Sequence, residues 1–209
     1  MIYILVEGHG DTGAVSNLVN RLWLDLQLPF IPIHSPGLRW KNLHKLEGLK
    51  KGVEYIRTKQ NVSGLLIVRD DEDNCPVNVV PDVSVNLRAL NTPFPIAYHI
   101  MYREFETLFL PCLNVFAGQE IKYDFGAGKI LISRDANFIG DFEGNRDAKG
   151  IVSRFYPQGK SYKPNVDQLP LTRLIDFEIL RRVQLPCFGT LERCLRHLAN
   201  NQGKSNVYP

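Results

Sequence analysis

The chain has 209 residues, of which 44% are hydrophobic and 22% are charged, and these are the proportions of a globular domain. They exclude a disordered, collagen-like or coiled-coil protein. The formal net charge of +3 permits contact with nucleic acid but does not indicate it. Because no apolar run approaches the ~20 residues of a membrane-spanning helix and no secretory signal is recognisable, we expect a cytoplasmic protein without a membrane partner.

Short apolar runs alternate with segments of helical period in the first half of the chain, which predicts a parallel sheet covered by helices. Strands are expected at residues 2–6, 30–34, 65–68 and 94–101. Helices are expected after the first strand, over residues 43–56, within 79–90 and over 104–110. The first helix has one apolar face, formed by Val15, Leu18, Val19, Leu22 and Leu26.

From about residue 118 onward, glycines interrupt a stretch with little periodicity, which predicts loops and short irregular pieces. Helical spacing returns near the C-terminus, where Leu191, Cys194, Leu195 and Leu198 recur on one face. We therefore divide the chain into an α/β core, residues 1–117, and an extension, residues 118–209, that ends in helices and packs on the core. The four cysteines contain no C-x-x-C pair and are expected to be free thiols.

The glycine-rich segment Gly8-His9-Gly10-Asp11-Thr12-Gly13 lies between a predicted strand and a predicted helix, as a dinucleotide fingerprint does. A ribose-binding acid is then expected about 20 residues later. The segment from Ile31 to His34 offers no carboxylate there. The charge of Glu7 would also lie close to the pyrophosphate, so a nicotinamide or flavin site is disfavoured.

Carboxylates follow two of the predicted strands. Glu7 ends the first, and the run from Asp70 to Asp73 follows the strand at residues 65–68. Since the carboxyl ends of parallel strands open at one edge of a sheet, these acids can converge there and bind Mg²⁺ or Mn²⁺. The simpler alternative is a polar loop that ends a strand, with Glu7 accepting hydrogen bonds from turn amides. The joint position of the acids after two strands favours the metal site.

At these residues the chain resembles the Toprim domain, which topoisomerases, bacterial primases and OLD-type nucleases share. Within that group it is most similar, over most of its length, to the bacterial family called domain of unknown function 4276. The motifs that carry the resemblance are Val6-Glu7-Gly8, Asp70 to Pro76, Arg103 to Phe109, Asp147-Ala148-Lys149, Tyr162-Lys163-Pro164, Leu174-Ile175-Asp176 and Cys187-Phe188.

The resemblance implies a nuclease that depends on Mg²⁺ or Mn²⁺ and hydrolyses phosphodiester bonds in DNA or RNA. Glu7 would act as general acid or base, and the acid-x-acid motif would hold metal. The motif fits two registers, Asp70-x-Glu72 and Asp71-x-Asp73, of which the following Cys75-Pro76 favours the first; Asp73 is a further candidate ligand.

Three more acids are candidate metal ligands by the same resemblance. Asp11 has the spacing of a second metal-binding acid in OLD-type nucleases, although a helix N-cap is the favoured role. Glu104 and Glu106 end the fourth predicted strand and are candidates for a second metal. His9, beside Glu7, is a weaker candidate for proton transfer.

Basic and aromatic residues near the predicted catalytic edge are candidates for nucleic-acid binding, namely Arg39, Trp40, Lys41 and Lys45. A solvated helix face and, for Trp40, a place in the core are the alternatives.

Members of the family often occur beside an ABC-type ATPase, which implies an ATPase partner and a role in defence against phage. Two other functions stay open: a non-catalytic Toprim-fold protein that binds the ATPase, and a metal-dependent phosphohydrolase or nucleotidyl transferase that acts on a nucleotide. A homo-oligomer is compatible with each of these functions. The sequence distinguishes neither DNA from RNA nor endonuclease from exonuclease.

Overall fold

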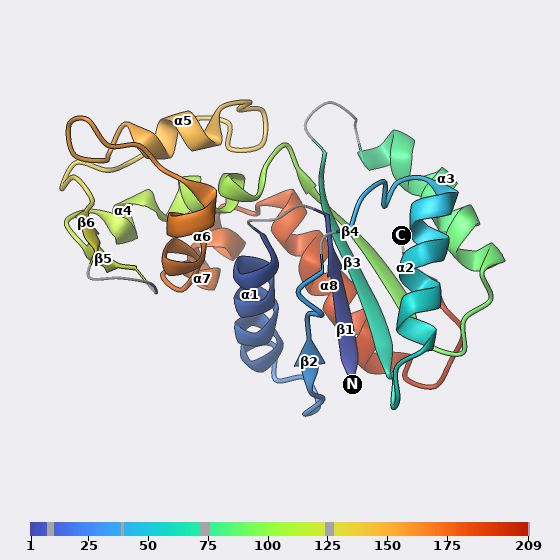
Figure 1. Cartoon of the computed structure of the whole chain (residues 1–209). Coiled ribbons are helices and arrows are strands. Elements are labelled where there is room, and N and C mark those ends of the chain that lie inside the picture. Colours follow the sequence, from blue (N-terminus) through green and yellow to red (C-terminus); the bar gives the residue numbers. More distant parts are fainter. Residues whose placement is uncertain (8–10, 39, 72–75, 124–127, 209) are drawn as a thin grey trace.

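A five-stranded sheet forms the centre of the computed structural model, which describes residues 1–7, 11–38, 40–71, 76–123 and 128–208 (Figure 1). The strand order is β2-β1-β3-β4-β7, and every neighbouring pair is parallel. The predicted α/β class, a parallel sheet flanked by helices, is therefore confirmed. The strands are β1 (Ile2–Val6), β2 (Ile33–His34), β3 (Gly64–Asp71), β4 (Ile96–Tyr102) and β7 (Val207–Tyr208).

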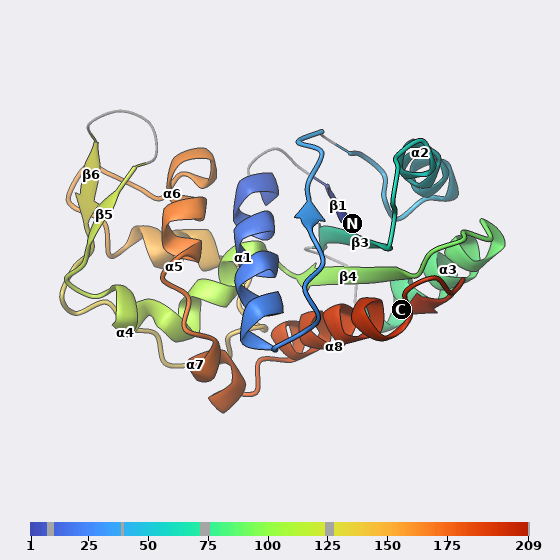
Figure 2. The ribbon, with the colours of Figure 1, turned by 90° about the horizontal axis from the view of Figure 1, so that it is seen from below.

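Two layers of helices cover the two faces of this sheet (Figure 2). On one face, called the α1 face, α1 (Asp11–Asp25) and α8 (Pro186–Asn200) pack on Ile4, Leu66 and Ala97. On the other, the α2 face, α2 (Leu46–Arg57) and α3 (Pro76–Ala89) pack on residues of opposite parity, such as Leu5 and Ile67. Since side chains alternate along a strand, this parity fixes the face on which each strand residue lies.

Strand β3 is longer than its apolar run. The prediction ended the strand at Val68, but pairing with β4 continues through Asp71, opposite Tyr102. Arg69 and Asp71 consequently share the parity of Ile67 and lie on the α2 face, whereas Asp70 lies on the α1 face.

Two other predicted elements differ in detail. The second strand, expected at 30–34, contains only Ile33 and His34, and Phe30 is 88% exposed. The fourth strand ends at Tyr102, so Glu104 and Glu106 do not end it, contrary to the prediction: Glu104 precedes and Glu106 lies within a 3₁₀ helix, η1 (Phe105–Cys112). Pro111 has no amide N–H, so it donates no hydrogen bond to the preceding turn of this helix.

The second half of the chain contains more regular structure than predicted. A two-stranded antiparallel sheet, β5 (Glu120–Lys122) and β6 (Lys129–Leu131), follows α4 (Leu113–Phe116), and α5 (Ala148–Ser153), α6 (Pro164–Thr172) and α7 (Phe177–Arg182) come next. In Figures 1 and 2 these pieces lie beyond α1, with α6 alongside it. The chain then returns to the sheet, because α8 packs on β3 and β4, and β7 pairs with β4.

Cys112, Cys187 and Cys194 are free and buried, as expected. Cys75 lies outside the described residues. In the parts of the chain that the structure describes, none of the helices has the length and apolarity to cross a membrane.

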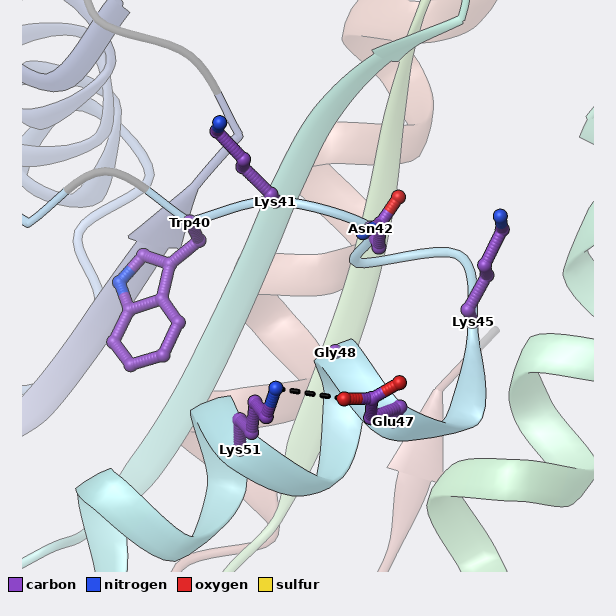
Figure 3. A pocket seen from close by; sticks show the side chains of 7 residues that line it. All are labelled: Trp40, Lys41, Asn42, Lys45, Glu47, Gly48 and Lys51. Carbon is purple, nitrogen blue, oxygen red and sulfur yellow. Dashed lines mark hydrogen bonds and ion pairs between the residues drawn. The ribbon is translucent and has the colours of Figure 1, made fainter.

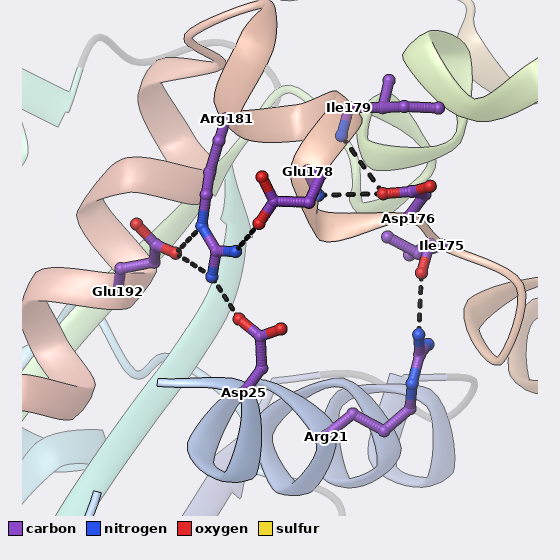
Figure 4. A network of polar contacts seen from close by, with 8 residues as sticks. All are labelled: Arg21, Asp25, Ile175, Asp176, Glu178, Ile179, Arg181 and Glu192. Atoms are coloured by element: carbon purple, nitrogen blue, oxygen red, sulfur yellow. Dashed lines mark hydrogen bonds and ion pairs between the residues drawn. The ribbon is translucent and has the colours of Figure 1, made fainter. Parts of the chain in front are cut away.

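One arginine near the C-terminal end of α7 connects three helices through ion pairs (Figure 4). Arg181 forms ion pairs with Asp25 of α1, Glu178 of α7 and Glu192 of α8, the last at 2.8 Å. Burial opposes the charge on Arg181, but hydrogen bonds to these three carboxylates raise its pKa above the ordinary arginine value. The side chain is still 29% exposed, so water weakens each pair.

We expect Arg181→Met to lower the free energy of unfolding by about 1 kcal/mol, because exposed ion pairs contribute little singly and this residue makes three. Arg182→Met, at the exposed neighbouring position, is the matched control and should change stability by less than about 0.5 kcal/mol. Urea unfolding of both variants measures the difference, and equal losses would contradict a role for the network.

The burial of His99 predicts that the fold loses stability at acidic pH. The side chain lies in β4 on the α1 face, is fully buried, and neither ring nitrogen has a hydrogen-bond partner among the described residues. Burial, helped by the charge of Arg193, lowers its pKa from 6.5 to about 3. The unfolded chain therefore binds a proton that the folded chain does not between these pH values, so stability is complete above pH 6.5 and falls as the pH drops towards 3.

Between pH 6.5 and 4.5 this linkage should cost the wild type about 3 kcal/mol, at about 1.4 kcal/mol for each pH unit. His99→Leu keeps an apolar side chain in the core and should remove that part of the pH dependence. Urea unfolding at pH 7 and pH 4.5 measures the change in unfolding free energy with pH. If the wild type and the variant lose the same amount, His99 is not responsible.

Candidate active site at the carboxyl edge of the sheet

Glu7 follows β1 and is held by a loop from the next crossover. Its amide donates to the carbonyl of Val68, and its Oε1 accepts the amide N–H of Asn42 at 2.7 Å. A parallel bridge also joins Glu7 to Trp40. The side chain is 26% exposed as a whole, but its Oε2 is buried on the side that faces Arg69.

Arg69 connects Glu7 to the acids of β3. Its Nε lies 3.3 Å from Glu7 Oε2, and its Nη1 lies 3.0 Å from Asp71 Oδ2. The guanidinium also contacts the hydroxyl of Tyr98. Burial opposes the charge on Arg69, but Tyr98, Asp71 and Glu7 together raise its pKa above the ordinary value. Burial raises the pKa of Tyr98 to about 12, against the pull of Arg69. Arg69 is therefore a buried cation between the carboxylates of Glu7 and Asp71.

A second cation lies at the same edge but on the α1 face. Lys149 Nζ lies 3.4 Å from Glu104 Oε2 and 3.7 Å from Glu106 Oε2, and its charge also interacts with Asp70. Burial opposes protonation of Lys149, but Glu106, Glu104 and Asp70 together raise its pKa. Asp70 and Asp71 thus have different surroundings, Lys149 for one and Arg69 for the other.

Glu106 is fully buried behind Lys149. Its Oε1 accepts the hydroxyl of Tyr162 at 2.7 Å and the Nε2 of Gln168 at 3.5 Å. Burial raises the pKa of Glu106, although Lys149 and Tyr162 oppose that shift. The residue therefore belongs to an internal polar network, with no solvent at its carboxylate.

The sequence-predicted metal ligands, together with the catalytic candidate His9 and the nucleic-acid-binding candidate Arg39, divide into three groups. Glu7 and Asp70 are partly exposed at the ends of neighbouring strands. Glu104 and Glu106 converge on Lys149, which already supplies a positive charge. His9, Arg39, Glu72, Asp73 and the side chain of Asp11 lie outside the described residues, although α1 does begin at residue 11.

The donor set that remains suits a divalent metal in its chemistry. Glu7 and Asp70 offer the hard carboxylate oxygens that Mg²⁺ and Mn²⁺ prefer, at the ends of adjacent strands, with Glu7 beside Arg69 on the α2 face and Asp70 beside Lys149 on the α1 face. Across the described ranges, no three Asp, Glu, His or Cys side chains come together as a metal cluster. Further ligands would come from the acids between residues 72 and 75.

A pocket of about 370 Å³ lies between the loop at residues 40–45 and the start of α2 (Figure 3); Glu7 does not line it, but the lining residues Trp40 and Asn42 contact Glu7. Trp40, Lys41 and Lys45, all predicted for nucleic-acid binding, line this pocket. The indole of Trp40 also packs on Tyr55, with ring centroids 5.4 Å apart, so its alternative role in the core is supported too. Asn42, Glu47, Gly48 and Lys51 complete the lining.

Gly48 lets the loop approach α2 closely. A Cβ at this position would lie 2.2 Å from the carbonyl oxygen of Asn42. In α8, a Cβ at Gly189 would meet only the end of the Arg193 side chain, at 3.6 Å. The two helical glycines therefore differ in what surrounds them and not in their helical setting.

We expect Gly48→Ala to lower the free energy of unfolding by about 2 kcal/mol, because backbone atoms of the loop must move. Gly189→Ala should leave stability unchanged or raise it by up to about 1 kcal/mol, since alanine favours a helix. Urea unfolding compares the two, and equal values would contradict close packing of the loop on α2.

Sequence reasoning did not assign Arg69, Lys149 or Tyr162 to the site. The apolar run predicts that Arg69 is the first residue after a strand, whereas it is a cation inside β3. Lys149 did fall in a motif that carried the family resemblance, so a signal for it was present. Tyr162 also falls in one of these motifs, Tyr162-Lys163-Pro164, but the sequence does not indicate its contact with Glu106, from which 56 positions separate it.

Comparisons with models of protein families, with curated proteins and with solved structures found no match.

Proposed function

We propose that the chain is a Toprim-like nuclease that depends on Mg²⁺ or Mn²⁺ and hydrolyses phosphodiester bonds in DNA or RNA. The observation that supports this most is the position of Glu7 and Asp70, partly exposed acidic residues at the carboxyl ends of two adjacent parallel strands. Crevices at that edge are where open α/β sheets bind ligands.

Glu7, Asp70 and acids of residues 72–75 would hold the metal, and a bound Mg²⁺ would activate a water molecule and neutralise charge on the scissile phosphate. The chain's own groups have separate tasks. The Glu7 carboxylate, oriented by the N–H of Asn42, accepts the proton of the attacking water. Arg69, buried between Glu7 and Asp71, holds Glu7 at the edge, and the partly exposed Lys149 places a positive charge near Asp70, where a phosphate would lie.

The proposal includes an ATPase partner and a role in defence against phage, both taken from the family resemblance. The fold and the acids equally suit a metal-dependent phosphohydrolase or nucleotidyl transferase that acts on a nucleotide, and a non-catalytic partner of the ATPase. We rank the nuclease first because a lysine-lined pocket adjoins Glu7, where a polyanion would lie.

The test is cleavage of plasmid, linear DNA, single-stranded DNA and tRNA in Mg²⁺, Mn²⁺ or EDTA. Each reaction is run with and without any ATPase that a neighbouring gene encodes. Polymer cutting that stops in EDTA and in a Glu7→Gln preparation supports the nuclease. Turnover of mononucleotides without polymer cutting would favour the nucleotide enzyme. No turnover of any substrate by the folded protein would favour the binding partner.

A further inference from the structure

We infer that the pocket beside Glu7, lined by Trp40, Lys41, Lys45 and Lys51, is a subsite for one nucleoside monophosphate unit of a nucleic-acid strand. This deepens the proposed function, on which it rests for the meaning of the site, by naming the unit that would be held beside Glu7. The volume of about 370 Å³ is within the range of small-ligand sites, ~300–1,000 Å³.

The charges around the pocket favour an anion. Three lysines and one glutamate line it, and Glu47 is already paired with Lys51 at 2.7 Å. Lys41 and Lys45 are exposed and make no ion pair within the described portion of the chain. Figure 3 shows Lys41 and Lys45 at opposite ends of the loop, pointing in different directions and away from the Glu47–Lys51 pair. A phosphate dianion would supply a partner for either ammonium group.

An aromatic wall distinguishes this pocket from a plain lysine patch. Trp40 is half-buried, with Tyr55 beside its ring, so the indole is held in place while part of it faces the pocket. A fixed aromatic surface beside ammonium groups suits a nucleotide, whose base stacks on aromatic side chains while its phosphate takes the cations.

The pocket is connected to the candidate catalytic residue through the backbone. Trp40 is bridged to Glu7, and the amide of Asn42 donates to Glu7 Oε1 at 2.7 Å. The same three-residue segment, 40–42, therefore forms one wall of the pocket and orients the Glu7 carboxylate. A nucleotide in the pocket would place the next phosphate of its strand towards Glu7.

Binding is tested without catalysis, by fluorescence titration in EDTA. The chain has two tryptophans, and Trp23 is 2% exposed, so a Trp23→Phe background leaves Trp40 as the reporter. We expect saturable binding of thymidine 5′-monophosphate, weaker binding of inorganic phosphate and none of thymidine. Calorimetric titration of the wild type repeats the comparison without the Trp23 change.

The double variant Lys41→Gln/Lys45→Gln should bind thymidine 5′-monophosphate about tenfold more weakly or worse. Lys50→Gln is the matched control, because Lys50 is an exposed lysine of α2 outside the pocket, and its affinity should be unchanged. Glu47→Gln should strengthen binding, since it frees Lys51.

No saturable binding of the monophosphate, or equal weakening by Lys50→Gln, would overturn the subsite. The two proposals fail separately in these experiments. Binding in EDTA without polymer cleavage in Mg²⁺ or Mn²⁺ leaves the subsite and removes the nuclease. If the wild type cleaves polymers but the Lys41→Gln/Lys45→Gln variant binds thymidine 5′-monophosphate as tightly as the wild type, the nuclease proposal stands and the subsite is ruled out.

Discussion

Asp70→Asn should lower the rate of metal-dependent cleavage on the order of 100-fold or more and leave the stability of the fold unchanged. Asp71→Asn should instead lower the stability and leave cleavage largely intact. Asp70 is partly exposed at the carboxyl edge, and Lys149, whose charge interacts with it, keeps Glu104 and Glu106 as partners in the variant. Asp71 is 4% exposed and paired with Arg69 at 3.0 Å, so its loss weakens a buried contact. We expect Asp71→Asn to cost about 2 kcal/mol of unfolding free energy.

The measurements are initial cleavage rates in Mg²⁺ and urea unfolding in EDTA, for both variants and for Glu7→Gln. Glu7→Gln should match Asp70→Asn in the loss of cleavage. The pair also separates the two registers of the acid motif. Loss of cleavage in Asp71→Asn, with wild-type stability and an active Asp70→Asn, would favour Asp71-x-Asp73 over Asp70-x-Glu72.

Elements with strong apolar patterns could be predicted from the sequence, and weak ones could not. Strand β1 has the bounds expected from its apolar run, and the C-terminal leucines do form α8. Strand β7 has two residues and no pattern, and it forms only because β4 offers it a pairing edge. Strand β3 was cut short because a charged side chain normally marks a strand's end, whereas Arg69 is neutralised by partners on its face of the sheet.

The candidate site shows the same limit. That acids follow β1 and β3 is visible in the sequence, because strand ends define the edge. The surroundings of each acid are not visible, because they depend on which face of the sheet it occupies and on distant residues. Glu106 resembled a metal ligand by its position after a strand, yet Lys149 and Tyr162, far along the chain, enclose it.

Arg69→Met should be the most destabilising of these substitutions, at about 3 kcal/mol or more, because it removes the cation that two carboxylates share. Asp71 would be left buried as a charge without compensation, and Glu7 would lose its contact at 3.3 Å. Lys51→Met is the control: the two side chains of its ion pair with Glu47 are 71% and 80% exposed, so stability should not change measurably.

A double-mutant cycle shows whether the loss comes from the stranded carboxylate. Asp71→Asn in the Arg69→Met background removes the uncompensated charge, so the double variant should be more stable than Arg69→Met alone. Additive losses would instead mean that Arg69 acts through the packing of its side chain. Because Glu7 also contacts Arg69, recovery should be incomplete, and the remainder measures what this arginine contributes by holding Glu7 at the sheet edge.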